Sequence, residues 1–90
     1  MSYELETVGR VTHYYTRLGV AVIELFDRVA LGDWVHFYGR STNFVQPIQS
    51  MQSQHQAIAE AFADEMVAVQ VEYRVREGDL VYPYRPDALI

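Results

Sequence analysis

Histidine residues, which often serve in proton transfer and metal binding, are few and widely separated in this chain. Histidine is the side chain that exchanges protons closest to neutral pH, and the chain has three: His13, His36 and His55. No His-x-His or Glu-x-x-His spacing accompanies them, and there is no cysteine. Paired carboxylates and nucleophile-base spacings are also missing. We therefore expect no catalytic residue, no metal and no cofactor, and interpret the histidines as outward-facing side chains on or beside strands.

Arginine and aromatic side chains give the stronger signal, which is one for binding. All seven basic residues are arginines, whose planar guanidinium fits phosphate or carboxylate groups and stacks on rings. Seven tyrosines, four phenylalanines and one tryptophan cannot all fill one small core, so some aromatics must be exposed. Trp34 and Tyr38 are the aromatic residues we select for a binding surface. Exposed rings beside arginines suit a single-stranded nucleic acid, whereas an exposed aromatic patch equally marks a protein interface.

The charge distribution bears on that choice. The formal net charge of -5 disfavours non-specific binding to a nucleic-acid backbone and favours the protein interface. Acidic residues are nevertheless missing between Glu6 and Glu24 and between Asp33 and Glu60. Three arginines, Arg10, Arg17 and Arg40, lie in those two stretches and could supply a cationic surface. The alternative is that these arginines are solvated or paired with the acids.

A glutamine-rich stretch follows in the second acid-free segment. It contains Gln46, Gln49, Gln52, Gln54 and Gln56 together with His55. Such a series is either a solvated surface or a polar ledge able to hydrogen-bond a ligand. Under the second hypothesis, Gln52 and His55 are the residues we expect to contact a terminal nucleotide.

These residues must be positioned mainly by β-strands. Alternating apolar residues and β-formers predict strands at 9–15, 20–25, 33–38, 67–71 and 80–82, and Pro83 is expected to end the last one. Residues 44–52 predict a strand with a bulge, and Pro47 indicates an edge or a bulge. Gly-Asp steps at 32–33 and 78–79 predict tight turns. Residues 58–66 have helical spacing, so a helical turn and a loop both stay open for residues 57–66.

Length and composition limit the organisation of the chain. Ninety residues form one domain, so we assign residues 1–90 to a single unit with its core at about 8–84. No apolar run is long enough to span a membrane, and the acidic N-terminus is unlike a signal peptide. We therefore expect a soluble cytoplasmic protein. The alternation predicts one core that contains Val11, Ile23, Val35, Ile48, Val67 and Val69.

The order of several short motifs resembles the second domain of translation elongation factors such as elongation factor Tu and elongation factor 1-alpha. The motifs are Gly9-Arg10-Val11, residues 21–25, Leu31-Gly32-Asp33-Trp34-Val35, Ser50-Met51, residues 58–63, residues 67–71 and residues 75–81. This resemblance implies an all-β fold, a closed six-stranded Greek-key barrel. It also implies a translation-associated, elongation factor-like binding module that contacts RNA, a tRNA end or an RNA-handling protein. The alternative function is a protein-interaction or structural subunit without a nucleic-acid role.

The chain departs from that family at three points. It has neither a phosphate-binding loop nor any lysine, so we expect no GTP binding or hydrolysis. Asp64-Glu65 stands where the family carries a Gly-Asp turn. Gln52 stands where tRNA-carrying members have a glutamate that contacts the terminal nucleotide.

Overall fold

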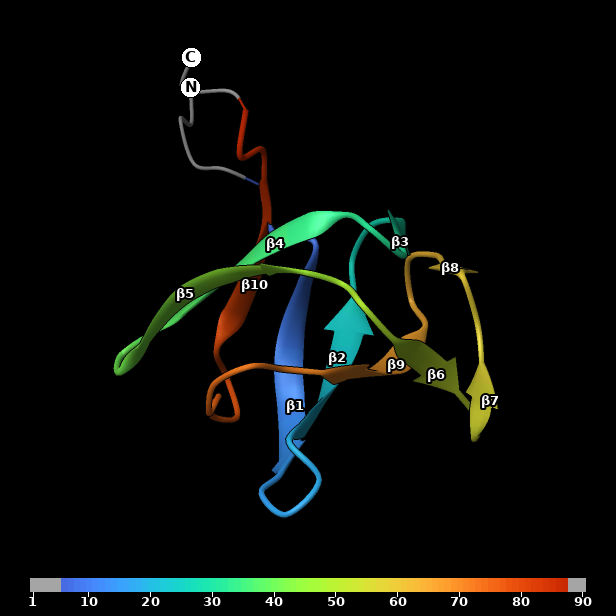
Figure 1. Ribbon diagram of the computed structural model, residues 1–90, viewed down its shortest axis with the longest axis horizontal. Coiled ribbons are helices and arrows are strands. Elements are labelled where there is room, and N and C mark those ends of the chain that lie inside the picture. The colour runs from blue at the N-terminus through green and yellow to red at the C-terminus, as the bar shows by residue number, and fades with distance from the viewer. Residues whose placement is uncertain (1–5, 88–90) are drawn as a thin grey trace.

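The protein is built from β-strands and turns, which confirms the predicted all-β class. A computed structural model describes residues 6–87 of the chain (Figure 1). Its ten strands are β1 (Gly9–Tyr15), β2 (Val20–Leu25), β3 (Val29–Ala30), β4 (Trp34–Gly39), β5 (Thr42–Pro47), β6 (Met51–Ser53), β7 (Gln56–Ala57), β8 (Glu60–Ala61), β9 (Met66–Gln70) and β10 (Leu80–Tyr84). The strands predicted at 9–15 and 20–25 coincide with β1 and β2.

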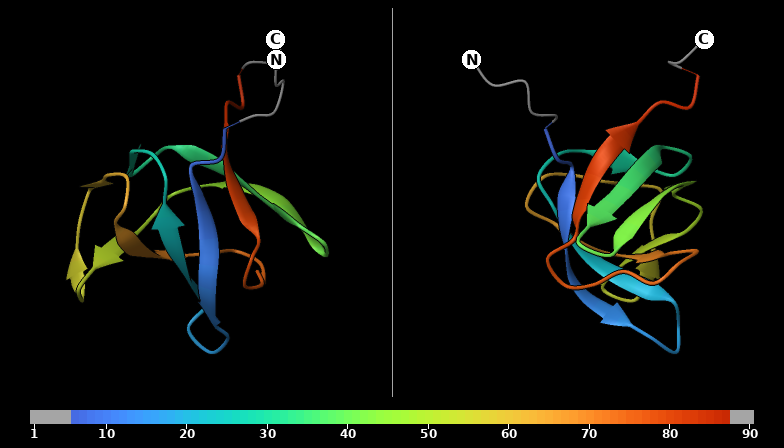
Figure 2. Two further views of the ribbon diagram at one scale, coloured as in Figure 1. Left: turned by 180° about the vertical axis from the view of Figure 1, so that it is seen from behind. Right: turned by 90° about the vertical axis from the view of Figure 1, so that its left-hand side faces the viewer.

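Eight of these strands form one antiparallel sheet that curls around the core (Figure 2). Their order is β5-β4-β10-β1-β2-β9-β6-β7, and β3 and β8 pair separately. The expected closed barrel of six strands is not what the ladders form, because no ladder within residues 6–87 joins β5 to β7. The sheet is divided into more and shorter strands than predicted, since turns and bends interrupt the segments that alternation alone makes look continuous.

One hydrophobic core occupies the concave side of the sheet. All six residues predicted for it, Val11, Ile23, Val35, Ile48, Val67 and Val69, are buried, which confirms the inferred alternation. Phe37 and Leu25 are the largest side chains among the fully buried ones. Phe37 stacks on Phe44 with ring centroids 5.1 Å apart, and Tyr73 packs edge-on against Phe44 at 5.2 Å.

The two Gly-Asp steps form nearly identical tight turns, as predicted. In each, the glycine has a positive φ, 90° at Gly32 and 93° at Gly78, a conformation that costs glycine little. The N–H of Asp33 donates to the carbonyl of Ala30 at 3.1 Å, and the N–H of Asp79 donates to the carbonyl of Arg76 at 3.0 Å. Each aspartate carboxylate accepts the N–H of the first turn residue in return, at 2.9 and 2.8 Å.

A third turn of the same kind replaces the helix that the spacing of residues 58–66 allowed. The N–H of Glu65 donates to the carbonyl of Phe62 at 3.2 Å, and Asp64 has a φ of 74° in the place of the glycine. The tight turn is therefore kept although the glycine is missing, because aspartate tolerates the left-handed region better than most residues. Ala61 of the segment is buried in β8, whereas Phe62 and Met66 are exposed.

Pro83 does not end the last strand, contrary to expectation. The ladder between β10 and β4 continues through Pro83, opposite Val35, to Tyr84, opposite Trp34. The carbonyl of Val81 accepts the N–H of Val8, so alternate residues of β10 turn their backbone groups toward β1. Pro83 faces that same side, beyond the last pair of β1, and its missing N–H therefore costs no ladder bond.

Gln46 holds β5 against the segment after β9, and no ladder among residues 6–87 joins these two segments. Its side chain is buried, with 1% exposed, contrary to the solvated position allowed for the glutamine series. Its Nε2 donates to the carbonyls of Gln70, at 3.0 Å, and Pro47, at 3.2 Å, and its Oε1 accepts the N–H of Glu72 at 2.8 Å. One side chain thus makes the backbone contacts that a ladder would make between strands.

Candidate functional site

The three arginines selected from the sequence lie on different parts of the surface. Arg10, in β1, faces outward and pairs with Glu24 of β2 at 3.1 Å. Arg17 is exposed in the loop between β1 and β2, and Arg40 is exposed in the turn between β4 and β5. These two hairpin ends point in different directions in both views (Figures 1 and 2). The fold therefore spreads the three arginines over separate elements.

Gln52 and His55 lie on a third hairpin, formed by β6 and β7. Ser53 pairs with Gln56, which leaves Gln54 and His55 as a two-residue loop, and their φ values are 51° and 65°. Positive φ at both positions is typical of a type I′ turn, in which asparagine and glycine are the preferred residues. The side chains of Gln52 and His55 are exposed. The assignment of these five residues to an RNA contact stays a prediction that the geometry does not test.

Trp34 and Tyr38 belong to a row of rings on the outer side of the sheet. We define the aromatic face as Trp34, His36 and Tyr38 of β4 with Tyr82 and Tyr84 of β10. Ring centroids are 6.2 Å apart for Trp34 and Tyr84, 6.3 Å for His36 and Tyr82, and 5.6 Å for His36 and Tyr38. These separations are within the range of favourable aromatic pairs.

Strand register brings these rings together. Trp34 pairs with Tyr84 and His36 pairs with Tyr82 across the ladder, while Val35 and Phe37 point to the core. The Nε2 atom of His36 is 2.6 Å from Oδ1 of Asn43 on β5, which fixes the ring at the middle of the row. Trp34 and Tyr38 stay 36% and 49% exposed. The face is thus a set of paired rings that is partly exposed to solvent.

A hollow adjoins the aromatic face at the start of β4 and the end of β10. It has a volume of about 270 Å³. Its apolar lining comes from Val8, Val29, Val35 and Pro83, its aromatic lining from Trp34 and Tyr84, and its charged lining from Arg28, Asp33 and Arg85. Trp34 and Tyr84 therefore belong both to the aromatic face and to the hollow.

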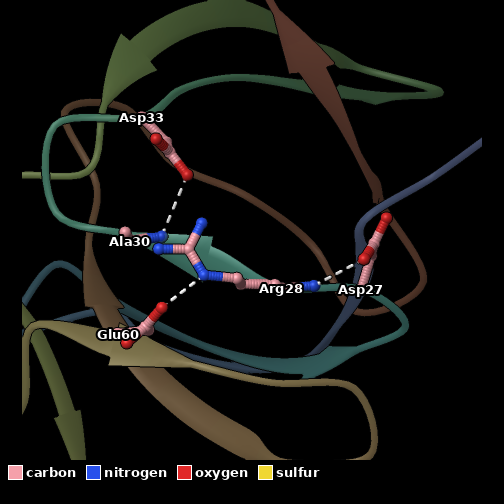
Figure 3. Close-up of polar contacts among 5 residues, drawn as sticks. All are labelled: Asp27, Arg28, Ala30, Asp33 and Glu60. Carbon is pink, nitrogen blue, oxygen red and sulfur yellow. Dashed lines mark hydrogen bonds and ion pairs between the residues drawn. The ribbon is translucent and has the colours of Figure 1, made fainter.

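The charged residues of the hollow differ in how far they are engaged (Figure 3). The Nε of Arg28 donates to Oε2 of Glu60, so this guanidinium is paired. Oδ2 of Asp33 accepts the N–H of Ala30 at 2.9 Å within the turn. Arg85 is exposed and has no ion-pair partner among residues 6–87. The hollow thus presents one paired guanidinium, one guanidinium outside any ion pair, and one carboxylate.

The sequence interpretation missed the contribution of the C-terminal strand to this site. Tyr82 and Tyr84 have the two-residue spacing of a strand face, but the expectation that Pro83 ends the strand separated them. The lining residues of the hollow come from four segments that only the strand pairing brings together. No group of three or more histidine, aspartate or glutamate side chains suited to a metal occurs within residues 6–87. In the same part of the chain no helix is long and apolar enough to cross a membrane.

Comparison with known proteins places the chain beside peptidase-like proteins. No protein-family model matches the sequence. The chain is 37% identical over 81 residues to an uncharacterised protease of Methanocaldococcus jannaschii, a match that spans 89% of this chain and 20% of that protein. The chain thus covers about a fifth of the length of this relative.

Solved structures share the fold. The C-terminal domain of a putative U32 peptidase from Geobacillus thermoleovorans superimposes with a TM-score of 0.84 at 22% identity, over 89% of this chain and 93% of that one. The selenomethionine variant of that domain gives 0.82 at 22% identity, over 86% and 98%. At this identity the likeness is one of fold.

These findings correct the resemblance to elongation factors. The motifs that suggested it are short turn and strand patterns, whereas the sequence match to the archaeal protease extends over most of the chain. The expectation of a translation-associated, elongation factor-like protein was therefore wrong. The chain is similar in sequence to one part of an uncharacterised protease and in fold to the C-terminal domain of a putative U32 peptidase.

Proposed function

We propose that this chain is an accessory domain of the U32 peptidase type, which does not cleave peptide bonds itself and acts beside a separate catalytic part. The support is the 37% identity to a segment that makes up only a fifth of a protein named as a protease. The likeness in fold to a C-terminal domain of a putative U32 peptidase agrees with an accessory position. The catalytic part is therefore the partner that we infer.

The aromatic face is the observation that carries this proposal. Aromatic residues are enriched in the cores of protein interfaces, where charged residues are depleted. Strand pairing holds the backbone that carries the five rings, and a hydrogen bond to Asn43 holds the ring of His36, so part of the conformational entropy is already lost before binding. A rigid, partly exposed row of this kind fits a protein partner with an apolar patch.

Barrel-like closure of the sheet is part of the proposal, since it would keep the face rigid. The Gln46 side chain joins β5 to the segment after β9 by hydrogen bonds to Gln70 and Glu72. We infer that this contact makes the curled sheet behave as a closed barrel. β4, which carries Trp34, His36 and Tyr38, pairs with β5 along its whole length and is held by the same closure.

Hydroxyl-radical footprinting read by mass spectrometry tests the proposed contact. The sample is a chimera in which this chain replaces the matching segment of the archaeal relative, and the reference is the free chain. We expect oxidation of Trp34 and Tyr38 to fall severalfold in the chimera, because the catalytic part covers the aromatic face.

Tyr15 provides a matched internal control. Tyr15 is 48% exposed and lies edge-on to His13 at 4.4 Å, much as Tyr38 is 49% exposed and lies edge-on to His36. Its oxidation should be the same in the chimera and in the free chain. Equal protection of Tyr15 and Tyr38, or protection of neither, would contradict the aromatic face as the contact. Peptide-bond cleavage by the purified chain that persists after contaminating proteases have been excluded would contradict an accessory role.

A further inference from the structure

We propose that the hollow beside Trp34 and Tyr84 binds the carboxylate end of a polypeptide whose last residue is small and apolar. This site goes beyond the contact with the catalytic part proposed above and does not depend on it. The proposal stands on three properties of the hollow, which are its size, its apolar and aromatic lining, and the state of its charged groups.

The size and the lining suit one terminal residue. The volume of about 270 Å³ is slightly below the ~300–1,000 Å³ of pockets that hold drug-sized ligands. Val8, Val29 and Val35 are buried at the apolar side and would accept an aliphatic side chain. The rings of Trp34 and Tyr84, tilted by 48° to each other, with Pro83 next to them, form the wall along which the preceding peptide unit would lie.

The charges select a carboxylate. Two guanidinium groups and one carboxylate line the hollow. Arg28 is already held by Glu60, which leaves the exposed Arg85 as the group able to receive a new anion. Guanidinium binds carboxylate through two parallel hydrogen bonds, and this planar geometry distinguishes a carboxylate from an amide.

Asp33 completes the recognition of a peptide end. One of its oxygens accepts the N–H of Ala30, and its other oxygen has no hydrogen-bond donor among residues 6–87. This second oxygen can accept the last amide N–H of a bound peptide. A cation for the carboxylate and an acceptor for the amide N–H together define a peptide terminus better than either does alone.

The fluorescence of Trp34 reports binding directly, because it is the single tryptophan of the chain. The 90-residue chain is titrated with acetyl-alanyl-alanine, with the amide of the same peptide, and with acetate. We expect a saturable change with the free acid, at least tenfold weaker binding of the amide, and no saturation with acetate. The tenfold figure follows from about 1.5–3 kcal/mol for hydrogen bonds to a charged group.

Two variants separate the role of Arg85 from a general charge effect. Arg85→Gln should lower the affinity for the free acid at least tenfold and leave the affinity for the amide unchanged. Arg74→Gln, which removes another exposed arginine outside the hollow, should change neither affinity. Equal affinity for acid and amide, saturation by acetate alone, an unaffected Arg85→Gln variant, or no saturable change at millimolar peptide would each overturn the proposal. None of these outcomes changes the protection from oxidation that we expect for Trp34 and Tyr38 in the chimera. Either proposal can therefore fail while the other stands.

Discussion

Replacing Gln46 by leucine should destabilise the domain, because this side chain supplies the hydrogen bonds that link β5 to the segment after β9. The substitution keeps the volume and the burial but removes both the donor and the acceptor. The N–H of Glu72 and the carbonyl of Gln70 then lose their partner in a partly buried place. Each unsatisfied group costs about 1–3 kcal/mol, and the added apolar surface offsets part of this cost.

We expect the free energy of unfolding to fall by about 2 kcal/mol, a substantial share of the ~5–15 kcal/mol typical of a domain. The melting temperature should then fall by roughly 10 °C, since 1 kcal/mol corresponds to about 4–8 °C for a domain of this size. Urea unfolding followed by Trp34 fluorescence and a thermal scan by circular dichroism measure the two quantities. The control is Gln52→Leu, at an exposed glutamine of β6, which should change stability by less than ~0.5 kcal/mol.

A second substitution at the same position has a distinctive pH dependence. Gln46→Glu puts a carboxyl oxygen in the place of Nε2, next to the carbonyls of Gln70 and Pro47. Only the protonated carboxyl can donate there, and burial also disfavours the charged form, so the pKa of the introduced group should be raised by folding. Folding then favours proton uptake, and stability should be highest below about pH 4.3 and fall as the pH rises.

If Gln46→Leu is as stable as the wild type, the Gln46 side chain only fills space. The stability of the sheet then does not depend on the hydrogen bonds that link β5 to the segment after β9. A Gln46→Glu variant whose stability rises between pH 4 and 7 relative to the wild type would refute the hydrogen-bond roles assigned to Oε1 and Nε2. Two-state unfolding with an unchanged denaturant slope is needed for either comparison, since the slope reports the surface exposed on unfolding.

Three further predictions concern turns and nucleotides. Asp64→Gly should stabilise the domain by about 0.5–1 kcal/mol in urea unfolding, because its φ of 74° suits glycine better, and a loss of stability would contradict the glycine-like role of Asp64 in its turn. Gly39→Ala should lower the free energy of unfolding by more than ~2 kcal/mol, because the added Cβ would overlap Oδ1 of Asp79. A variant as stable as the wild type would show that the Asp79 side chain can move away at little cost. Calorimetry with GTP should give no binding heat, because the phosphate-binding loop and all lysines are missing, and micromolar affinity would contradict this.

Local features of the fold could be predicted from the sequence, because they depend on neighbouring residues. Alternation located β1 and β2, and the glycines at 32 and 78 marked turns that only a residue tolerant of positive φ completes cheaply. Strand order depends instead on pairing between distant segments, such as that of β1 with β10, which no local pattern encodes. The turn at Asp64 could not be predicted for the same reason. The surrounding strands impose a turn there that the sequence of residues 58–66 does not require by itself.

The site was predictable only in part. Trp34 and Tyr38 were selected because a small core cannot hold every ring, and both are exposed. Tyr82 and Tyr84 were separated by the weight given to Pro83, whose missing N–H matters only on the side of a strand that has a partner. Gln46 could not be told from the exposed glutamines near it, because its burial depends on strands that follow it by more than twenty residues. The family was misassigned because turn motifs reflect backbone physics that unrelated β proteins share.

The position of the last strand has a consequence for synthesis of the domain. β10 lies between β4 and β1, so a nascent chain that ends before Leu80 has two strands whose inner edges face no partner. Such edges can pair with other chains while the ribosome is still adding residues. The ladders of β10 with β4 and β1 can form only after Tyr84 has left the exit tunnel, so the middle of the sheet is completed late in synthesis.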